Sequence, residues 1–411
     1  MERKVGSSAN KPGLFKKMIS IIGPGLITAA IVMGPGSITV SSKIGASMGY
    51  SALWAVLAAA IMMTAFSKMG TTIGIVSQES LLQTVRNKYG NLLSLIIGLG
   101  GFFIIAGFQT GNNIGAGLAF STVFGGSVGM WAGIFTVIAL VFMWGFKDMY
   151  GYLEKLMTFL VFIMIITFVG NVFYIRPNLG EVARGFVPSK PENMGLIISI
   201  SGTSFSVAAA AFQAYSVKAK GWKLDDLNEG LKSSYVGTTI LAIITMVIMI
   251  TAATVLKPAG IEVTSAIDMA TQLEPLLGSL AKWLFLLGFW SAAFSSFIGN
   301  AMIGGTLLAD GLGIGNSMES KWSKIFASFV MILGTLAAIL FGQNPIQLLI
   351  LAQGTTMLAV PIIAIVMLIL ANDKELMGKH KNSLLLNVVG VISVVWLLYL
   401  SFNQLMQFIG K

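Results

Sequence analysis

Long apolar stretches, separated by short polar segments, run through almost the whole chain. One bilayer crossing takes about 20 helical residues, and the stretches repeatedly reach that length. We therefore predict eleven membrane-spanning helices, at roughly 14–48, 51–77, 91–122, 129–146, 153–174, 194–220, 234–256, 273–309, 323–341, 345–371 and 383–408. The first, sixth and eighth exceed one clean crossing, which predicts a tilt, a break or an extension beyond the bilayer.

Two of these long stretches contain residues that interrupt a helix. The first holds Gly23-Pro24-Gly25 and then Met33-Gly34-Pro35-Gly36-Ser37; the sixth holds Ser201-Gly202-Thr203-Ser204-Phe205-Ser206. Proline removes a backbone donor and glycine tolerates unwound geometry. Interrupted helices at matching places in two halves of a chain are typical of a transporter site. We expect breaks near Gly34–Ser37 and Gly202–Ala208 that face each other at mid-membrane; two packing kinks are the alternative.

The composition agrees with a membrane protein. Of the 411 residues, 55% are hydrophobic and 10% are charged, whereas a soluble domain carries about a quarter charged residues. The first apolar run continues as a full-length segment without a small-residue cleavage site, so we expect no cleavable signal peptide.

The cations indicate an orientation. The net charge of +10 would suggest nucleic acid as the partner of a soluble protein, but the basic residues here lie at span ends. With a cytoplasmic N-terminus, 18 cations fall on the cytoplasmic side and 6 outside. The positive-inside bias then predicts a multi-pass plasma-membrane protein with its N-terminus in the cytoplasm and its C-terminus outside. We expect the lipid bilayer as a partner and no nucleic acid.

The reactive side chains are few. Cysteine is absent and His380, the single histidine, lies in a polar loop, which excludes disulfides, thiolate sites and a zinc site built on histidines. All sixteen acidic residues lie in the tail, in loops or at span ends, with Glu79, Glu154 and Asp310 closest to membrane depth. Intramembrane ionisable groups normally mark ion or proton routes. We therefore expect no proton relay, and no enzyme or cofactor either.

Several short motifs follow one another along nearly the whole chain: Gly23-Pro24-Gly25, Pro35-Gly36, Gly74-Ile75-Val76, Ile114-Gly115, Leu153-Glu154, Gly185-Phe186-Val187-Pro188, Ser295-Ser296, Gln353, Pro361 and Leu376-Met377-Gly378. In this order and at this spacing, they make the chain resemble the Nramp family of divalent-metal transporters. The resemblance implies an all-helical LeuT-like fold of two inverted five-helix repeats plus one extra C-terminal helix. The tail would then be 1–13, the repeats 14–174 and 194–371, and the extra helix 383–408.

The chain departs from the family pattern at the metal site. The family's Asp-Pro-Gly-Asn stands here as Gly34-Pro35-Gly36-Ser37, and its Met-Pro-His-Asn aligns with Ser206-Val207-Ala208-Ala209. Gln109 and Asn112 align with two acids of the family's proton route, and Gln213 with a histidine. The chain is in this respect similar to the Nramp-related magnesium transporters, a divergent branch.

The expected site is made of oxygen atoms alone. Its candidate ligands to a metal ion are Gly34, Ser37, Gly202, Ser206 and Gln353. Hard cations such as Mg²⁺ take oxygen ligands, whereas transition metals prefer nitrogen or sulfur. Other roles stay open. The two serines could bond a carbonyl one turn back, Gln353 could tie two helices together, and the polar patch at 109–113 could be a packing network or a wet cavity.

The leading hypothesis is therefore a transporter of divalent cations, Mg²⁺ first and Mn²⁺ second, without proton coupling. The alternative is a carrier for a small neutral or zwitterionic organic solute, because a divalent ion at mid-membrane without a carboxylate is costly. A receptor without transport is a third class, but no loop is long enough for a signalling domain. The oligomeric state stays open, with a monomer as the simplest expectation.

Overall fold

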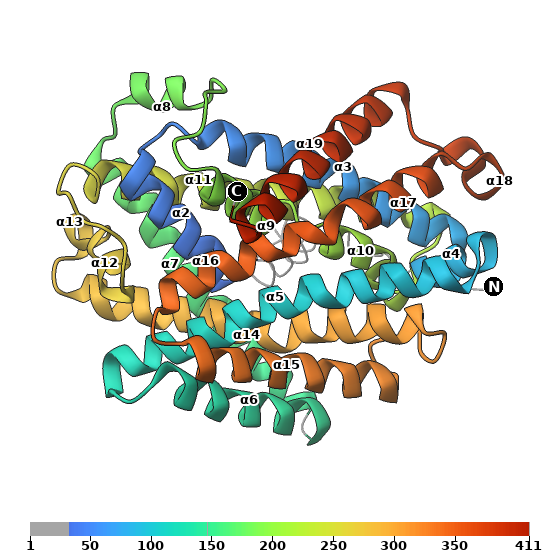
Figure 1. Cartoon of the computed structure of the whole chain (residues 1–411), viewed down its shortest axis with the longest axis horizontal. Helices are drawn as coiled ribbons and strands as arrows, with labels where there is room; N and C mark the ends of the chain where they lie inside the picture. Colours follow the sequence, from blue (N-terminus) through green and yellow to red (C-terminus); the bar gives the residue numbers. More distant parts are fainter. Residues whose placement is uncertain (1–32, 146, 411) are drawn as a thin grey trace, which may run out of the picture.

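The computed structural model describes residues 33–145 and 147–410, with the backbone alone for 147–154. Every regular element in these residues is a helix (Figure 1). The first part of the predicted first span, with its Gly23-Pro24-Gly25 cluster, lies outside the described residues.

Long helices match the predicted spans closely. They are α2 (Pro35–Met48), α3 (Leu53–Ser77), α5 (Asn91–Phe124), α6 (Val128–Gly145), α7 (Lys147–Ile175), α9 (Met194–Ser204), α10 (Val207–Ala219), α11 (Leu227–Val255), α14 (Leu280–Gly311), α15 (Lys321–Phe341), α16 (Pro345–Thr355), α17 (Val360–Asn372) and α19 (Leu384–Phe408). Within the described residues, nine spans are long and apolar enough to cross a membrane, or ten if the bent pair α16–α17 is one span. Helix α2, with 14 residues, is too short to cross alone.

Short helices connect the long ones, and the apolar pattern alone does not separate them from the spans. They are α4 (Leu81–Tyr89), α8 (Leu179–Gly185), α12 (Ala266–Thr271), α13 (Glu274–Leu277) and α18 (Lys374–Met377). The predicted eighth span, 273–309, is wrong at its start, because α14 begins only at Leu280. Gly278 adopts a φ of 55°, a conformation that suits glycine and ends α13 before the long helix begins.

The two ends of the bundle carry different short helices. Helices α4 and α18 lie together at one end, on the right of Figure 1, and we call this end the α4 face. Lys88 of α4 forms ion pairs there with Asp373 and Glu375. Helices α8, α12 and α13 lie at the opposite end, the α8 face.

Small residues let the central helices approach backbone to backbone. A Cβ atom on Gly70 of α3 would lie 2.0 Å from the carbonyl oxygen of Ala210 in α10, and one on Gly74 would lie 2.5 Å from the Cα of Ala214. Such close approach is how membrane helices gain packing energy where lipid offers no hydrophobic driving force. The region around α10 is therefore firmly held against α3.

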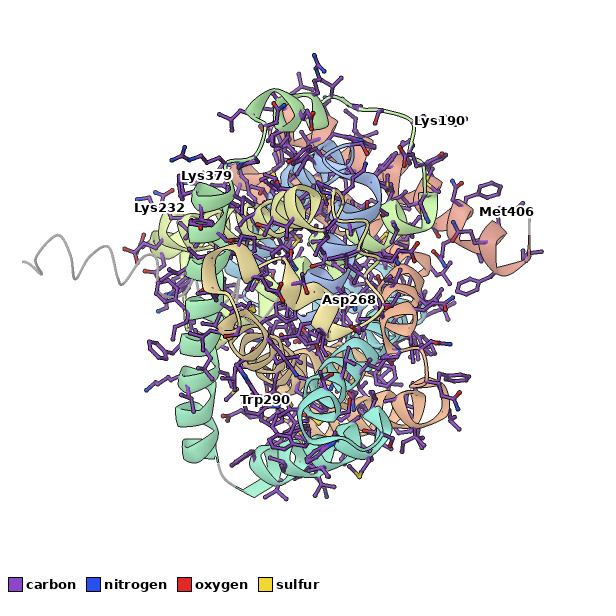
Figure 2. The ribbon with its side chains drawn as sticks, turned by 90° about the vertical axis from the view of Figure 1, so that its left-hand side faces the viewer. Lys190, Lys232, Asp268, Trp290, Lys379 and Met406 are labelled. Carbon is purple, nitrogen blue, oxygen red and sulfur yellow. The ribbon has the colours of Figure 1, made fainter. Side chains whose placement is uncertain are left out.

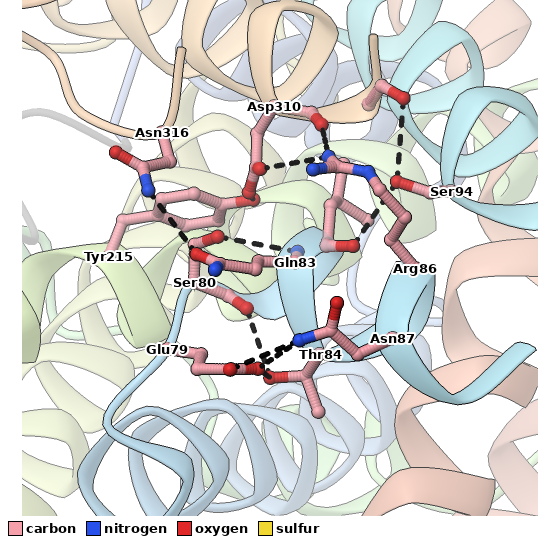
Figure 3. A network of polar contacts seen from close by, with 12 residues as sticks. Glu79, Ser80, Gln83, Thr84, Arg86, Asn87, Ser94, Tyr215, Asp310 and Asn316 are labelled. Carbon is pink, nitrogen blue, oxygen red and sulfur yellow. Dashed lines mark hydrogen bonds and ion pairs between the residues drawn. The ribbon is translucent and has the colours of Figure 1, made fainter. Parts of the chain in front are cut away.

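A buried charged cluster joins three elements at the α4 face (Figure 3). Arg86 of α4 donates through Nη2 to Asp310 at the end of α14, both to the carbonyl oxygen and, at 3.2 Å, to Oδ1. The Tyr215 hydroxyl of α10 donates to Oδ2 of the same carboxylate at 2.7 Å. Asp310 is only 1% exposed, so its charge is balanced within the protein. The cluster fixes α4, α10 and α14 to one another.

Candidate functional site

The sixth predicted span is broken, over a shorter stretch than expected. Helix α9 ends at Ser204 and α10 begins at Val207, which leaves Phe205 and Ser206 outside both helices. The predicted break ran from Gly202 to Ala208, but the residues at its two ends are helical. The carbonyls of Gly202, Thr203 and Ser204 lie in the last turn of α9, where an α-helix leaves its carbonyl groups without internal donors.

The other expected break also differs in extent. Gly34 is extended, with φ −84° and ψ 176°, and α2 begins directly after it at Pro35. Pro35 to Ser37 are therefore helical, contrary to the prediction, because proline at the first helical position loses no hydrogen bond and has the φ that a helix needs. Helices α2 and α9 contact each other, and Gly36 and Gly202, close to the two breaks, both pack against Gln353.

A further break was not predicted from the sequence. Helices α16 and α17 are bent by 43° relative to each other across a short 3₁₀ turn. Gln353 lies just before this turn, in the last helical turn of α16. The bend therefore places the carbonyl end of a third helix beside the other two breaks.

Gln353 lies in contact with three other helices at the predicted site. It is 2% exposed, and its side chain fills the space between two glycines: a Cβ atom on Gly36 would lie 2.3 Å from Nε2, and one on Gly111 would lie 2.7 Å from it. Its backbone carbonyl lies against Gly202 of α9, where a Cβ atom would come within 2.6 Å. Gln353 therefore touches α2, α5 and α9 at once. Its Oε1 has no hydrogen-bond partner within the described residues.

The remaining predicted residues are buried near these helix ends. Ser37 is 4% exposed in the first turn of α2, and Ser206 is 5% exposed in the break. The Ser206 hydroxyl caps α10 by accepting from the Ala209 amide at 3.4 Å, which leaves its second lone pair for another donor or an ion. Gly34 and Gly202 contribute backbone rather than side chains, so they supply space and carbonyl oxygens.

Asn112 of α5 is a candidate ligand that the sequence indicated only as part of a polar patch. Its Nδ2 donates to the Ser296 carbonyl at 3.2 Å and to Gln109 Oε1 at 3.4 Å. These two bonds turn Oδ1 towards Gly34, where a Cβ atom would lie 3.1 Å away. The amide oxygen of Asn112 thus lies where a side chain at position 34 would point. In the sequence, the polar patch in the third predicted span was the only indication of Asn112 as a candidate ligand.

The rest of that patch is a packing network. Gln109 donates to Asn113 Oδ1 at 3.0 Å. Asn113 in turn donates to Thr136 of α6 at 2.9 Å and to Thr335 of α15 at 2.8 Å. Of the two open interpretations, these satisfied amides favour packing for Gln109 and Asn113, because their bonds join side chains of packed helices rather than line a cavity.

Four buried hydroxyls on the two helices beside the breaks lack partners in the described part of the chain, as do others on α3 and α14. Ser201 and Ser204 of α9, and Thr39 and Ser41 of α2, have buried side-chain oxygens with no hydrogen bond within the described residues. A buried polar group left unsatisfied costs about 1–3 kcal/mol. The same residues contain no group of three or more acidic, histidine or cysteine side chains that could hold a metal ion. A cation at the breaks would therefore be held by neutral oxygens.

Comparison with known proteins identifies relatives along the whole chain. The family described as "Natural resistance-associated macrophage protein-like" matches residues 25–407. The "Divalent metal cation transporter MntH" of Staphylococcus saprophyticus is 25% identical, over 97% of this chain and 95% of that protein. The "Natural resistance-associated macrophage protein 2 homolog" of Dictyostelium discoideum is 25% identical, over 96% of this chain and 64% of that protein.

Solved structures agree on the fold. A mutant of the Eremococcus coleocola manganese transporter superposes with a TM-score of 0.77 at 18% identity, covering 98% of this chain and 90% of that one. MhsT in complex with L-phenylalanine superposes with a TM-score of 0.60 at 15% identity, covering 92% and 98%. These neighbours share the LeuT-like fold, as predicted. The chain belongs to the Nramp family of membrane transporters and is not an enzyme.

Proposed function

We propose that this protein carries a hard divalent cation across the plasma membrane, with Mg²⁺ preferred and Mn²⁺ second, without moving protons. The observation that carries the proposal is the buried, unpartnered Oε1 of Gln353 between three helices of the described part of the chain. An amide oxygen in that position can accept from a water molecule of a hydrated ion or bind the ion itself. The relatives named as divalent-metal and manganese transporters support the divalent class.

The proposed ligand set explains the preference for hard ions. Oxygens come from Gln353, Asn112, Ser37 and Ser206 and from the last carbonyls of α9. Magnesium gives up its water reluctantly and usually keeps several molecules of it. Neutral oxygens around a space lined by glycine suit such a partly hydrated ion. Manganese and cadmium gain less, because no nitrogen or sulfur ligand takes part in the proposed set.

The scarcity of buried acids in the described residues supports transport without proton coupling. Asp310 is the only carboxylate that is buried in the described residues, and Arg86 and Tyr215 already bind it at the α4 face. We infer that the protein transports the cation without transporting protons.

The proposed orientation has the α4 face in the cytoplasm, with the C-terminal end of α19 outside. Arg86 and Lys88 of α4 and Lys374 and Lys379 beside α18 lie in the segments at that face. This is the concentration of cations that the positive-inside bias requires. We propose a monomer, since the Gln353 site draws only on helices of one chain.

A second candidate is a carrier for a small neutral or zwitterionic organic solute. Helices α2 and α10 both begin at the breaks, so their positive ends face the site. Such ends favour a carboxylate and disfavour a cation. The neighbour MhsT is named with L-phenylalanine, which supports the same alternative.

Uptake into proteoliposomes distinguishes the two candidates. We expect Mg²⁺ to enter faster than Mn²⁺ and Ca²⁺, and a panel of amino acids to stay outside. Gln353→Leu is expected to lower Mg²⁺ uptake at least tenfold. Asn403→Leu serves as the matched control, because Asn403 donates only to Tyr399 of its own helix. If an amino acid is taken up and Mg²⁺, Mn²⁺ and Ca²⁺ are not, the cation proposal is wrong and the solute carrier takes its place.

A further inference from the structure

A cavity lies next to α16, and Gly354, the sequence neighbour of Gln353, is one of its lining residues. It has a volume of about 570 Å³ and lies between α2, α9, α16 and α19, together with the loop before α12. This size is within the range of small-molecule sites, roughly 300–1,000 Å³. Gln353 is not among its lining residues. Figure 2 views the molecule from the α8 face, with Asp268 near the middle and Met406 of α19 at the margin.

The lining of this cavity is positive and otherwise neutral. Lys43 is its only ionisable side chain, and the other polar side chains are amides and hydroxyls: Asn193, Ser199, Thr264, Gln343, Asn344, Gln347, Gln404 and Gln407. Lys43 uses one proton of its ammonium group to donate to the Val263 carbonyl at 3.1 Å. The ammonium group carries three donors, so two remain for a ligand. Two acids adjoin the lining in the sequence, Glu192 before Asn193 and Glu262 before Val263, but both are exposed and neither lines the cavity.

Two helices begin at the same cavity. Asn193 caps α9, accepting from the Leu196 amide at 3.1 Å, and Asn344 precedes α16, where its side chain forms no cap bond. Both residues line the cavity. The positive ends of two helices of 11 residues each therefore add to the charge of Lys43. Anions bind at such helix ends through free backbone amides.

Gln404 independently indicates a ligand. This residue of α19 lines the cavity and is 3% exposed, and its side chain forms no hydrogen bond to any described residue. Its Oε1 lies beside Gly354, 3.1 Å from where a Cβ atom would be. Because the Gln404 amide lines the cavity without a partner among the described residues, its donors and its acceptor are available to a polar molecule bound there.

We propose that this cavity binds a small organic acid. Lys43 and the amino ends of α9 and α16 hold its carboxylate, and the amides of Gln404 and Gln407 bind its remaining polar groups. The chemistry of the lining excludes a divalent cation from this place, because it offers one fixed positive charge and no carboxylate. The lining shares no residue with the proposed cation ligands, so this proposal does not depend on the cation site.

Binding to the purified full-length protein tests the proposal. Sodium lactate and sodium succinate are titrated calorimetrically, with sodium chloride and sodium phosphate at matched ionic strength. We expect saturable binding of a carboxylate, weakened at least tenfold by Lys43→Met and by Gln404→Leu. Lys43→Arg, which keeps the charge, is expected to remain within a few-fold of wild type. Lys190→Met, which removes an exposed cation of the α8 face, is the matched control.

Three results would overturn the proposal. The first is an absence of saturable binding by both acids in the wild-type protein. The second is equal binding of chloride or phosphate, which would leave a simple anion site. The third is lactate binding that Gln353→Leu abolishes and Lys43→Met leaves unchanged, because the acid would then occupy the breaks. A melting curve for each variant shows whether the fold is intact, and Lys43→Arg decides the role of charge if Lys43→Met unfolds.

Discussion

Gly34→Asp combined with Ser206→Met is expected to raise the affinity for Mn²⁺ and Cd²⁺ by tenfold or more and to weaken the preference for Mg²⁺. A Cβ atom at position 34 would lie 3.1 Å from Asn112 Oδ1 and 4.0 Å from the Ser296 hydroxyl. A carboxylate there would therefore enter the proposed ligand set directly, after Asn112 shifts by a few tenths of an ångström. Methionine at position 206 would add a soft sulfur, which favours the transition metals.

The size of this effect follows from charge. A tenfold change in affinity corresponds to about 1.4 kcal/mol, and a buried carboxylate next to a divalent ion supplies at least that much. Gly34→Asn with Ser206→Met is the matched control, because it adds the same volume without charge. Calorimetric titration of both variants and the wild-type protein with Mg²⁺, Mn²⁺ and Cd²⁺ measures the affinities. If wild-type protein already binds Cd²⁺ tightly, the set of neutral oxygens is wrong.

Asp310→Leu is expected to destabilise the protein by about 3 kcal/mol, the lower end of the cost of breaking a buried ion pair. The lower end applies because the Arg86 side chain is 23% exposed and keeps part of its hydration. The substitution removes the carboxylate that Arg86 and Tyr215 share, although Arg86 keeps its bond to the backbone carbonyl of residue 310. Thermal unfolding in detergent should show a fall of several degrees in melting temperature.

Graded variants separate charge from packing at this cluster. Asp310→Asn keeps an oxygen for Tyr215 but loses the charge that faces Arg86, so it should cost less than Asp310→Leu. Asp225→Asn removes an exposed acid and is expected to change the melting temperature hardly at all. Equal melting temperatures for Asp310→Leu and wild type would show that the cluster does not hold α4, α10 and α14 together.

The spans could be predicted because a bilayer imposes one rule on every crossing segment. Apolar runs of about 20 residues are visible without knowledge of their neighbours, and most predicted boundaries agree with the structure within a few residues. The start of the eighth span was missed because Gly278 ends α13 just before α14 begins, inside a segment that we predicted as one helix. The break between α16 and α17 was missed because Pro361 can also start a helix, which is its place in α17.

The site was less visible in the sequence. Gln353 was identified as a candidate ligand, but its packing against Gly36 and Gly111 was not predicted. The sequence does not show which distant side chain fills the space beside a glycine. Asn112 could be recognised as polar, but its direction depends on Ser296 in a helix far along the chain. The cavity of Lys43 and Gln404 was not predicted at all, because its lining comes from four helices spread over the whole sequence.

The central claim is that the cation passes through a neutral site without a proton, and one measurement tests it most directly. Proteoliposomes are loaded with a Mg²⁺ dye and a pH dye, and both signals are followed after Mg²⁺ is added outside. We predict that internal Mg²⁺ rises while internal pH stays constant, with or without an imposed proton gradient. Acidification that tracks Mg²⁺ entry, and disappears when Mg²⁺ is left out, would contradict this claim.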